Sequence, residues 1–508
     1  MAVADFVLSR APERGARAAL VDPASQRAIT YRDLTDDVAR VAAGLASLGL
    51  QKGQVCAIFS PNTIDYAIAV LAIVRLGAIV TTANPLYTVD ELAPQLHDAR
   101  AKVLIAAPAV QAVALDAARL GGVEHVIAFG EFTGAIPFDE LRGSTTSPPE
   151  PAINPDAIVV MPYSSGTTGL PKGVMLSHRN IVANILQLDA TGHLRDGEDT
   201  LICFLPFFHI YGLVVVMLLG LWRGATLVVM PRFDLDHYIT LIERYRATML
   251  HVVPPVALAL AKQAAIDGRD FSSVRKLFSG AAPLSTAVIA DCTTRLGCQL
   301  QQGYGLTEAS PATHTTTDDT CAREGSVGPP VANTECCIVD PSGKRLGPGD
   351  GDGELWVRGP QVMLGYFHRP EATRETLDEE GWLHTGDIAR VDERGNFFIV
   401  DRLKELIKYK GMSIAPAELE AVLVSHPAVA DVAVIPVADD DAGEIPKAFV
   451  VLKSSATTEE LMTYVAARVA SFKKVRKMEI VDQIPKSPSG KILRRVLRDR
   501  ERVAAERA

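Results

Sequence analysis

The sequence predicts an α/β protein with a large N-terminal domain of helix-covered, mostly parallel sheets and a small α+β C-terminal domain. Buried-strand patterns alternate with helical patterns over the first 150 residues and again between 155 and 300. Residues 325–400 instead place frequent Gly, Pro and Asp between short strands, which is typical of an antiparallel unit. A further strand–helix unit begins near Asp401. We therefore place the domains at 1–401 and 402–508.

The N-terminal alternation begins with an amphipathic helix within residues 29–49, where apolar residues recur at helical spacing up to Gly49. Residues 54–60 follow as a short buried strand, residues 63–77 as a helix and residues 78–85 as the next strand. Strands separated by helices in this way belong to parallel sheets with helices on their faces.

The later elements follow the same reasoning. Short strands of the antiparallel unit are expected at 335–340, 353–359 and 397–401. The C-terminal unit is expected to contain helices over 415–426 and 458–470 and strands over 429–437 and 477–482. Its end is rich in Lys and Arg, which predicts either a solvated face or a face that meets a polyanionic ligand.

Composition narrows the class of protein. Hydrophobic residues make up 48% of the 508 residues and charged residues 22%, as in ordinary globular domains. The net charge of −9 argues against a nucleic-acid partner. The seven cysteines form no CxxC pair, so we expect a reducing, cytoplasmic location and no structural zinc. The sequence does not separate a monomer from a homodimer.

One stretch, residues 201–222, carries no formal charge and is long enough to span a bilayer. Pro206, His209 and two glycines interrupt it. We therefore expect a buried segment that lines a pocket, and no stable membrane insertion. The N-terminus shows no basic start followed by a long apolar run, so no signal peptide is expected.

Residues 164–173 read Ser-Ser-Gly-Thr-Thr-Gly-Leu-Pro-Lys-Gly and follow a strand pattern over 157–164. Hydroxyl groups, glycines and one lysine are suited to an anion. A P-loop NTPase needs Ser or Thr after its lysine, but Gly173 follows Lys172, which excludes that reading. Composition alone leaves a phosphate loop and a Gly/Thr surface turn equally open.

Four segments together are more specific, and they are residues 163–178, 301–310, 381–411 and 484–495. In order and spacing they resemble the motifs of the adenylate-forming superfamily, which includes acyl-CoA synthetases, firefly-type luciferases and the adenylation domains of peptide synthetases. Residues 205–213 and the last segment make 4-coumarate–CoA ligases and bacterial cinnamate-activating ligases the closest resemblance. The chain departs from the plant pattern in its "GELWVRG" box and at Ser413.

The resemblance implies a two-step reaction with small-molecule partners. A carboxylic acid and ATP, with Mg²⁺, give an acyl-adenylate and pyrophosphate, and coenzyme A then displaces AMP. It also implies that the C-terminal domain is mobile and rotates between the steps about a hinge at Lys404.

By the same resemblance, Lys491 acts where the carboxylate joins the α-phosphate, and Thr307 contacts that phosphate. Glu308 holds Mg²⁺, and His209 gates or contacts the acyl group. The implied nucleotide contacts are Ser164, Ser165, Gly166, Thr167, Thr168, Lys172, Gln302, Gly303, Tyr304, Thr307, Asp387, Arg402, Lys408 and Lys491. The implied coenzyme A contacts are Arg232, Lys410 and Gly411.

The resemblance also implies an acyl pocket lined by small or apolar residues, which suits a planar aromatic acid. They are His209, Tyr211, Val215, Ala281, Ala282, Gly303, Gly305, Pro311 and Ala312. Plant ligases often carry serine at the position of Val215, and a valine cannot pair with a phenolic hydroxyl. We therefore expect cinnamate to be accepted at least as well as 4-coumarate.

Other functions remain to be weighed. A medium-chain fatty acyl or benzoate CoA ligase shares these motifs and stays open. The absence of a peroxisomal ending disfavours a luciferase-like enzyme. An amino-acid adenylating enzyme usually has an aspartate where this chain has Phe208. A non-catalytic binding protein should have lost Lys491 or Glu308, and both are present.

Overall fold

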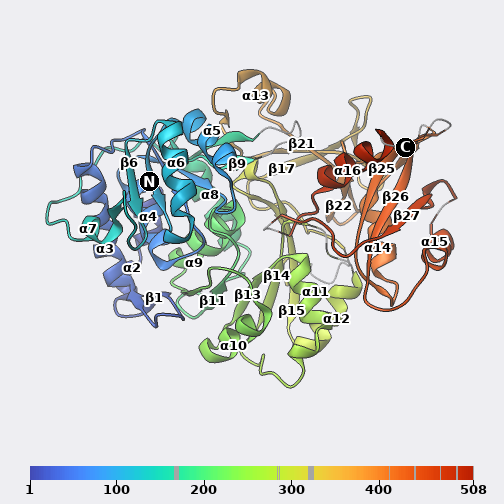
Figure 1. The fold of residues 1–508 in the computed structure, drawn as a ribbon, viewed down its shortest axis with the longest axis horizontal. Coiled ribbons are helices and arrows are strands. Elements are labelled where there is room, and N and C mark those ends of the chain that lie inside the picture. The colour runs from blue at the N-terminus through green and yellow to red at the C-terminus, as the bar shows by residue number, and fades with distance from the viewer. Residues whose placement is uncertain are drawn as a thin grey trace.

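The computed structural model describes the chain apart from residues 165–170, 283, 285, 319–324, 411, 440–441, 470, 488–489 and 507–508. Two large sheets form the N-terminal part, and two smaller sheets follow along the chain (Figure 1). The predicted mixed α/β fold, with helix-covered parallel sheets and separate antiparallel sheets, is confirmed.

The first large sheet has the order β20-β10-β8-β4-β3-β5-β6-β7, in which β10 spans Lys172–Ser177 and β20 spans Gly365–Tyr366. Its centre is parallel and mostly buried, which is why its strands are rich in hydrophobic residues. The central strands are β3 (Val55–Phe59), β4 (Ile79–Ala83), β5 (Ala101–Ala106), β6 (His125–Ala128) and β8 (Ile158–Val160), with β7 (Ile136–Pro137) at the edge. The helices that connect or flank them are α3 (Tyr31–Ser47), α4 (Ile64–Arg75), α5 (Val89–Ala99), α6 (Gln111–Gly121) and α7 (Phe138–Arg142).

The second large sheet has the order β16-β15-β14-β13-β11-β12-β1-β2. Its inner neighbours are parallel, and only the edge strands β2 and β16 are antiparallel to theirs. The strands are β1 (Ala18–Val21), β2 (Ala28–Thr30), β11 (Thr200–Cys203), β12 (Thr226–Val229), β13 (Met249–Val252), β14 (Lys276–Ser279), β15 (Gln299–Gly305) and β16 (Ala312–Thr315). The associated helices are α1 (Val3–Leu8), α2 (Ala11–Arg14), α8 (His178–Asp189), α10 (Leu235–Tyr245), α11 (Pro254–Lys262) and α12 (Thr286–Leu296).

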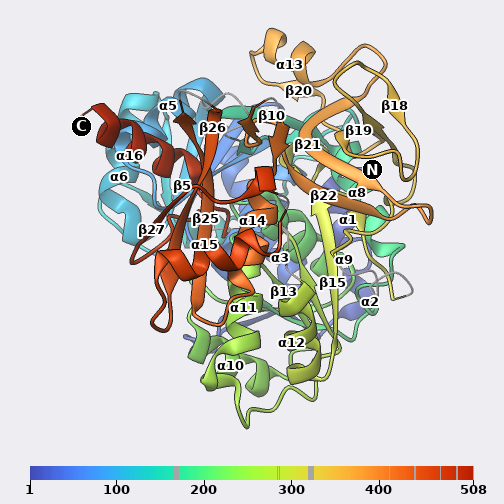
Figure 2. The same ribbon diagram turned by 90° about the vertical axis from the view of Figure 1, so that its right-hand side faces the viewer.

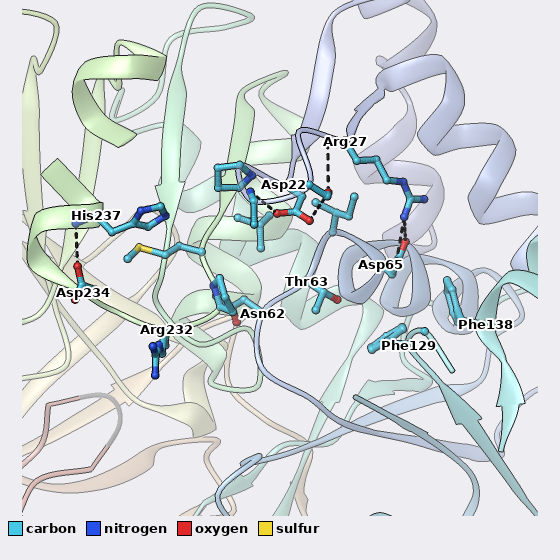
Figure 3. Close-up of a pocket in the computed structure, with 18 of the residues that line it drawn as sticks. Asp22, Arg27, Asn62, Thr63, Asp65, Phe129, Phe138, Arg232, Asp234 and His237 are labelled. Carbon is cyan, nitrogen blue, oxygen red and sulfur yellow. Dashed lines mark hydrogen bonds and ion pairs between the residues drawn. The ribbon is translucent and has the colours of Figure 1, made fainter. Parts of the chain in front are cut away.

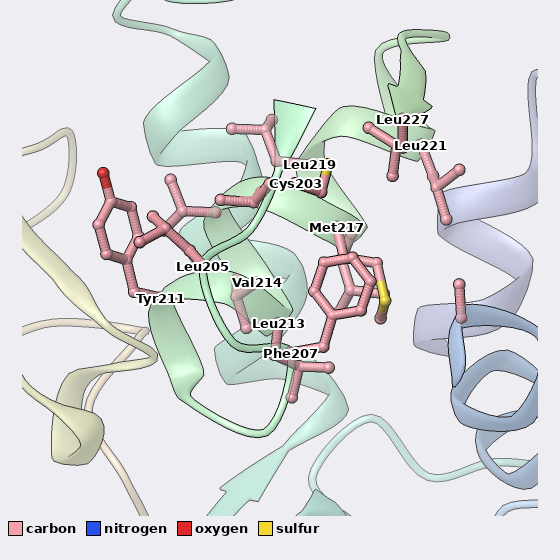
Figure 4. Packing of buried hydrophobic residues seen from close by; sticks show 14 of the residues in the cluster. Cys203, Leu205, Phe207, Tyr211, Leu213, Val214, Met217, Leu219, Leu221 and Leu227 are labelled. Carbon is pink, nitrogen blue, oxygen red and sulfur yellow. The ribbon is translucent and has the colours of Figure 1, made fainter. Parts of the chain in front are cut away.

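The uncharged stretch 201–222 is buried, as expected. It contains β11, the π-helix η2 (Tyr211–Leu218) and the short helix α9 (Leu219–Trp222), and every residue of η2 is buried. Figure 4 shows the ring of Tyr211 projecting on the side of η2 away from Leu221 and Leu227. Among the described residues no helix is both long enough and apolar enough to cross a membrane.

The third sheet is antiparallel, as predicted, with the order β18-β17-β19-β21-β22. Its strands are β17 (Glu335–Val339), β18 (Arg345–Leu346), β19 (Gly353–Arg358), β21 (Leu383–Val391) and β22 (Phe397–Arg402), with helix α13 (Pro370–Thr376) between β19 and β21. Strand β22 runs one residue past the predicted boundary at Asp401, so that boundary stays a prediction.

The last sheet carries its own core and lies in front of the large sheets in Figure 2. Its strands are β23 (Ile407–Tyr409), β24 (Met412–Ile414), β25 (Val429–Asp439), β26 (Gly443–Leu452) and β27 (Lys477–Ile480), with helices α14 (Pro416–Val424), α15 (Thr458–Ala466) and α16 (Arg494–Glu506). Helix α15 ends at Ala466, earlier than the residue 470 expected from its apolar spacing.

Candidate active site

A β-hairpin brackets the predicted phosphate loop. Strand β9 (Tyr163–Ser164) pairs antiparallel with β10 (Lys172–Ser177), and Ser164 lies directly opposite Lys172. The single strand expected over 157–164 is wrong, since β8 ends at Val160 and the next strand begins after Pro162, which has no N–H to donate. Ser165, Gly166, Thr167 and Thr168 lie outside the described residues.

Glu308 lies in the short 3₁₀ turn η4 (Thr307–Ala309), directly after Thr307, and its side chain is buried beside that hairpin. The Ser164 hydroxyl donates to Glu308 Oε1 at 2.8 Å, and the Tyr366 hydroxyl donates to the same oxygen at 2.9 Å. The described residues contain no cluster of three or more metal-ligating side chains. A single carboxylate suits Mg²⁺ that is held mainly by phosphate oxygens and water.

Asp387 forms a second polar centre on β21. The Tyr304 hydroxyl donates to its Oδ2 at 2.5 Å, and Arg402 Nε lies 3.3 Å from its Oδ1. Burial raises the pKa of Asp387, while Arg402 and the Tyr304 hydroxyl oppose that rise. The arrangement brings together Tyr304, Asp387 and Arg402, which the sequence predicted to surround the adenosine. Nearby, Gln302 is buried and its amide donates to Ser326 O.

Lys491 reaches this polar region from the C-terminal unit. Burial, and then Arg402, lower the pKa of its ammonium group to about 8, while Asp387, Glu405 and Glu308 attract the charge. A turn holds the lysine, because Ser487 N donates to Lys491 O and Lys491 N donates to Ser487 Oγ. At Gly490, which has φ +79°, an added Cβ would lie 3.0 Å from Pro255 Cδ, so the turn rests on the start of α11.

His209 lies within the electrostatic reach of Lys491. Burial and then the lysine charge lower the pKa of His209 to about 4, so the ring is neutral at pH 7. The Tyr211 backbone N–H donates to Nδ1 at 3.3 Å, which leaves the proton on Nε2. The ring can therefore donate one hydrogen bond from Nε2 without carrying charge.

The acyl side is built around η2 and the ends of β14 and β15. The Tyr211 hydroxyl donates to Phe278 O at 3.1 Å, and Val215 is only 4% exposed. A Cβ on Gly303 would lie 2.5 Å from Phe278 Cζ, and one on Gly305 would lie 2.1 Å from Pro311 O. These two glycines thus allow Phe278 and Pro311 to pack closely against β15. That the glycines line a flat acyl slot stays a prediction.

The remaining predicted pocket residues lie at the ends of the same strands. Ala281 has φ +74° and is exposed, Ala282 is half-buried, and Pro311 and Ala312 are buried on the approach to β16. These four residues therefore lie at or beyond the carboxyl ends of β14 and β15, the end of a sheet at which α/β proteins bind ligands.

A cavity of about 660 Å³ lies between the carboxyl ends of strands from both large sheets (Figure 3). Arg232 lines the cavity, whereas His209 and Lys491 do not. Arg232 is exposed and makes no ion pair within the described part of the chain, and Figure 3 shows it apart from the Arg27–Asp65 pair. An unpaired guanidinium beside a cavity suits a phosphate.

The other predicted residues of the C-terminal segment are exposed. Lys404 follows β22, Lys408 lies in β23, and Lys410 follows that strand with φ +47°. Gly411 lies outside the described residues. Their predicted roles at the hinge, the nucleotide and coenzyme A stay predictions.

Sequence reasoning missed three residues of the site. Tyr366 contacts Glu308, Glu405 attracts the Lys491 charge, and Phe278 packs against the predicted acyl residues. Tyr366 stands in a two-residue strand with no chemical motif around it. Phe278 carried a weak signal, because it lies in the buried strand β14 three residues before the predicted Ala281.

Comparison with known proteins identifies the family of this chain. A family model described as AMP-binding enzyme matches residues 8–367, and one described as AMP-binding enzyme C-terminal domain matches residues 418–491. The chain therefore belongs to the AMP-binding enzyme family, and the resemblance drawn from its motifs is confirmed.

Its relatives include plant enzymes of similar length. The chain is 45% identical to 4-coumarate–CoA ligase 5 of Oryza sativa subsp. japonica, over 97% of this chain and 93% of that protein. It is 42% identical to 4-coumarate–CoA ligase 1 of Petroselinum crispum, over 96% and 91%.

Solved structures with the same fold include the anthranilate CoA ligase AuaEII in complex with anthranoyl-AMP, with a TM-score of 0.91 and 26% identity over 100% of this chain and 98% of that one. ATP-bound MatB from Rhodopseudomonas palustris gives a TM-score of 0.89 and 29% identity over 98% and 99%.

Proposed function

We propose that the chain is an ATP-dependent ligase that joins an aromatic acid of the cinnamate or 4-coumarate type to coenzyme A through an acyl-adenylate. The main support is the convergence of Lys491, Asp387 and Glu308 from distant parts of the chain on one polar region. Relatives that carry the name 4-coumarate–CoA ligase at 45% and 42% identity support the substrate class.

In the first step a carboxylate oxygen attacks the α-phosphorus of ATP, and the bond to the bridging oxygen of pyrophosphate breaks. Lys491 faces the charge that gathers as the two anions meet, while Asp387 accepts hydrogen bonds from the ribose hydroxyls. Glu308 would hold Mg²⁺, which neutralises phosphate charge when it is bound. Ser164 and Lys172 flank the loop that grips the leaving pyrophosphate.

In the second step the thiolate of coenzyme A attacks the acyl carbon, and the carbon–oxygen bond to AMP breaks. His209 is neutral and keeps its Nε2 proton, so it orients the acyl group without attracting the AMP phosphate. Arg232, which lines the 660 Å³ cavity and has no ion-pair partner among the described residues, supplies a bidentate contact for the phosphates of coenzyme A.

The test is ATP–pyrophosphate exchange with a panel of cinnamates, benzoates and medium-chain fatty acids, repeated with coenzyme A to detect a thioester. We expect exchange with cinnamate and 4-coumarate and a thioester only when coenzyme A is added. Exchange confined to benzoates or fatty acids would show that the proposed substrate class is wrong. No exchange with any acid would show that the chain is not the proposed ligase.

A further inference from the structure

Tyr366 lies where the strand after the phosphate loop meets the segment that carries Glu308. Strand β20 (Gly365–Tyr366) pairs antiparallel with β10, so Tyr366 lies opposite Val174. Met363 N donates to Glu308 O at 2.8 Å, and Phe367 N donates to Gly173 O at 2.8 Å. The backbone around Tyr366 is therefore fixed relative to both elements, and its side chain is only 5% exposed.

The hydroxyl of Tyr366 contacts one oxygen of the Glu308 carboxylate. It donates to Oε1 at 2.9 Å, and the Ser164 hydroxyl donates to the same oxygen at 2.8 Å. No described residue donates a hydrogen bond to Oε2.

The ring of Tyr366 contacts a different charged group. Lys172 Nζ lies 4.9 Å from the ring centroid, within the range of a cation–π interaction. Lys172 makes no ion pair with any residue that the structure describes, so the ring of Tyr366 is a favourable contact for its charge. One side chain thus holds a cation near Glu308 while leaving both charges available.

We propose that Tyr366 is a positioning residue for the metal–nucleotide complex. Its hydroxyl fixes Glu308 Oε1 and leaves Oε2 available to hold Mg²⁺ when the ion is bound. Its ring orients Lys172, which would contact the phosphates of ATP, without pairing it to the carboxylate. The proposal rests on the proposed function, because it concerns how Mg²⁺ and ATP are held in the first step.

Two variants separate the hydroxyl from the ring. Tyr366→Phe removes the hydroxyl and keeps the ring, whereas Tyr366→Leu removes both. Tyr163→Phe is the matched control, because the Tyr163 hydroxyl also donates to a carboxylate, that of Asp98, at 2.7 Å. Calorimetric titration of each full-length protein with ATP, at a series of MgCl₂ concentrations and without any acid, measures binding rather than turnover.

We expect Tyr366→Phe to raise the Mg²⁺ concentration for half-maximal ATP binding about tenfold, as expected for one hydrogen bond to a charged group. Its ATP affinity without Mg²⁺ should match that of the wild type. Tyr366→Leu should weaken metal-free ATP binding as well, because Lys172 loses its ring contact. Tyr163→Phe should change neither quantity.

A Tyr366→Phe protein with the wild-type Mg²⁺ dependence would overturn the proposal, and so would an equal loss of ATP affinity with and without Mg²⁺. Thermal unfolding of the same samples identifies a variant that fails to fold. If Tyr366→Leu fails to fold, the Mg²⁺ dependence of Tyr366→Phe, which preserves packing, decides the test. Absence of ATP binding by the wild type would overturn the proposed function itself, an outcome distinct from failure of this proposal.

Discussion

At the scale of single residues, the charge state of Lys491 sets a pH limit on adenylation. Its ammonium has a pKa lowered to about 8, and only the protonated form neutralises charge. The value of kcat/KM for ATP should therefore fall as pH rises above about 8, since this parameter reports the free enzyme. ATP–pyrophosphate exchange measured from pH 6 to 10 gives the profile. The residual rate of Lys491→Ala should not fall above pH 8. If this variant still shows a fall with the same pKa, the fall belongs to another group.

Val215 gives a second prediction at this scale. It is a buried apolar residue on η2, and an unpaired phenolic hydroxyl beside it costs on the order of 1–3 kcal/mol. Val215→Ser should therefore raise kcat/KM for 4-coumarate relative to cinnamate by about fivefold or more. Val214→Ser, a change of the same kind on the neighbouring buried residue, is the control. If 4-coumarate gains nothing relative to cinnamate, the assignment of Val215 to the acyl pocket is wrong.

Most of the nucleotide-site residues that the sequence predicted stand in contiguous motifs such as 301–310 and 484–495. Tyr366 and Phe278 act through contacts that no local pattern encodes, since the Tyr366–Glu308 bond joins positions 58 residues apart. The charge grouping around Lys491 likewise depends on how β21, β22 and the C-terminal unit meet. Motifs therefore indicated the chemistry, whereas the residues that orient it required the fold.

At the scale of elements, the π-helix η2 is an unexpected feature. The sequence predicted only a buried segment, because a run without charges has no apolar face that would reveal its period. Gly212 explains its fit, since a Cβ there would lie 2.1 Å from Pro206 O, in the turn that leads to His209. At Gly220, in the following helix, the atoms nearest to an added Cβ would be in the side chains of Leu227 and Leu201, at 2.9 Å and 3.1 Å.

Gly212→Ala should therefore destabilise the protein by about 1–3 kcal/mol and displace His209, since the clash is with backbone. Differential scanning calorimetry should show a lower unfolding temperature, and ATP–pyrophosphate exchange should fall with it. Gly220→Ala is the matched control, because flexible leucine side chains can yield, and its loss should be smaller in both measurements. Equal losses in the two variants would contradict a special role for the Pro206 contact.

At the scale of the whole molecule, the alternation of strands and helices was sufficient to predict helix-covered parallel sheets, and the short strands of residues 325–400 predicted one antiparallel unit before an α+β C-terminal unit. Which strands adjoin was not predictable, because sheet order depends on contacts between distant segments; β1, for example, pairs with β12 more than 200 residues away. The C-terminal sheet has its own apolar core, which is compatible with movement as one body. Arg494 joins Glu405 and Glu420 within that unit, next to Lys491.

The C-terminal unit carries both Lys491 and Lys410, so its predicted rotation between the steps would make the two half-reactions separable. In this structure Lys491 lies among Arg402, Asp387 and Glu308, while Lys410 is exposed. If the body rotates between the steps, Lys491→Ala should slow acyl-adenylate formation about 10²–10³-fold, as for loss of one group facing developing charge, yet spare thioester formation from preformed acyl-AMP. Lys410→Ala should show the opposite pattern. Single-turnover measurement of each half-reaction gives the four rates, and a variant that slows both steps equally would argue for one fixed arrangement.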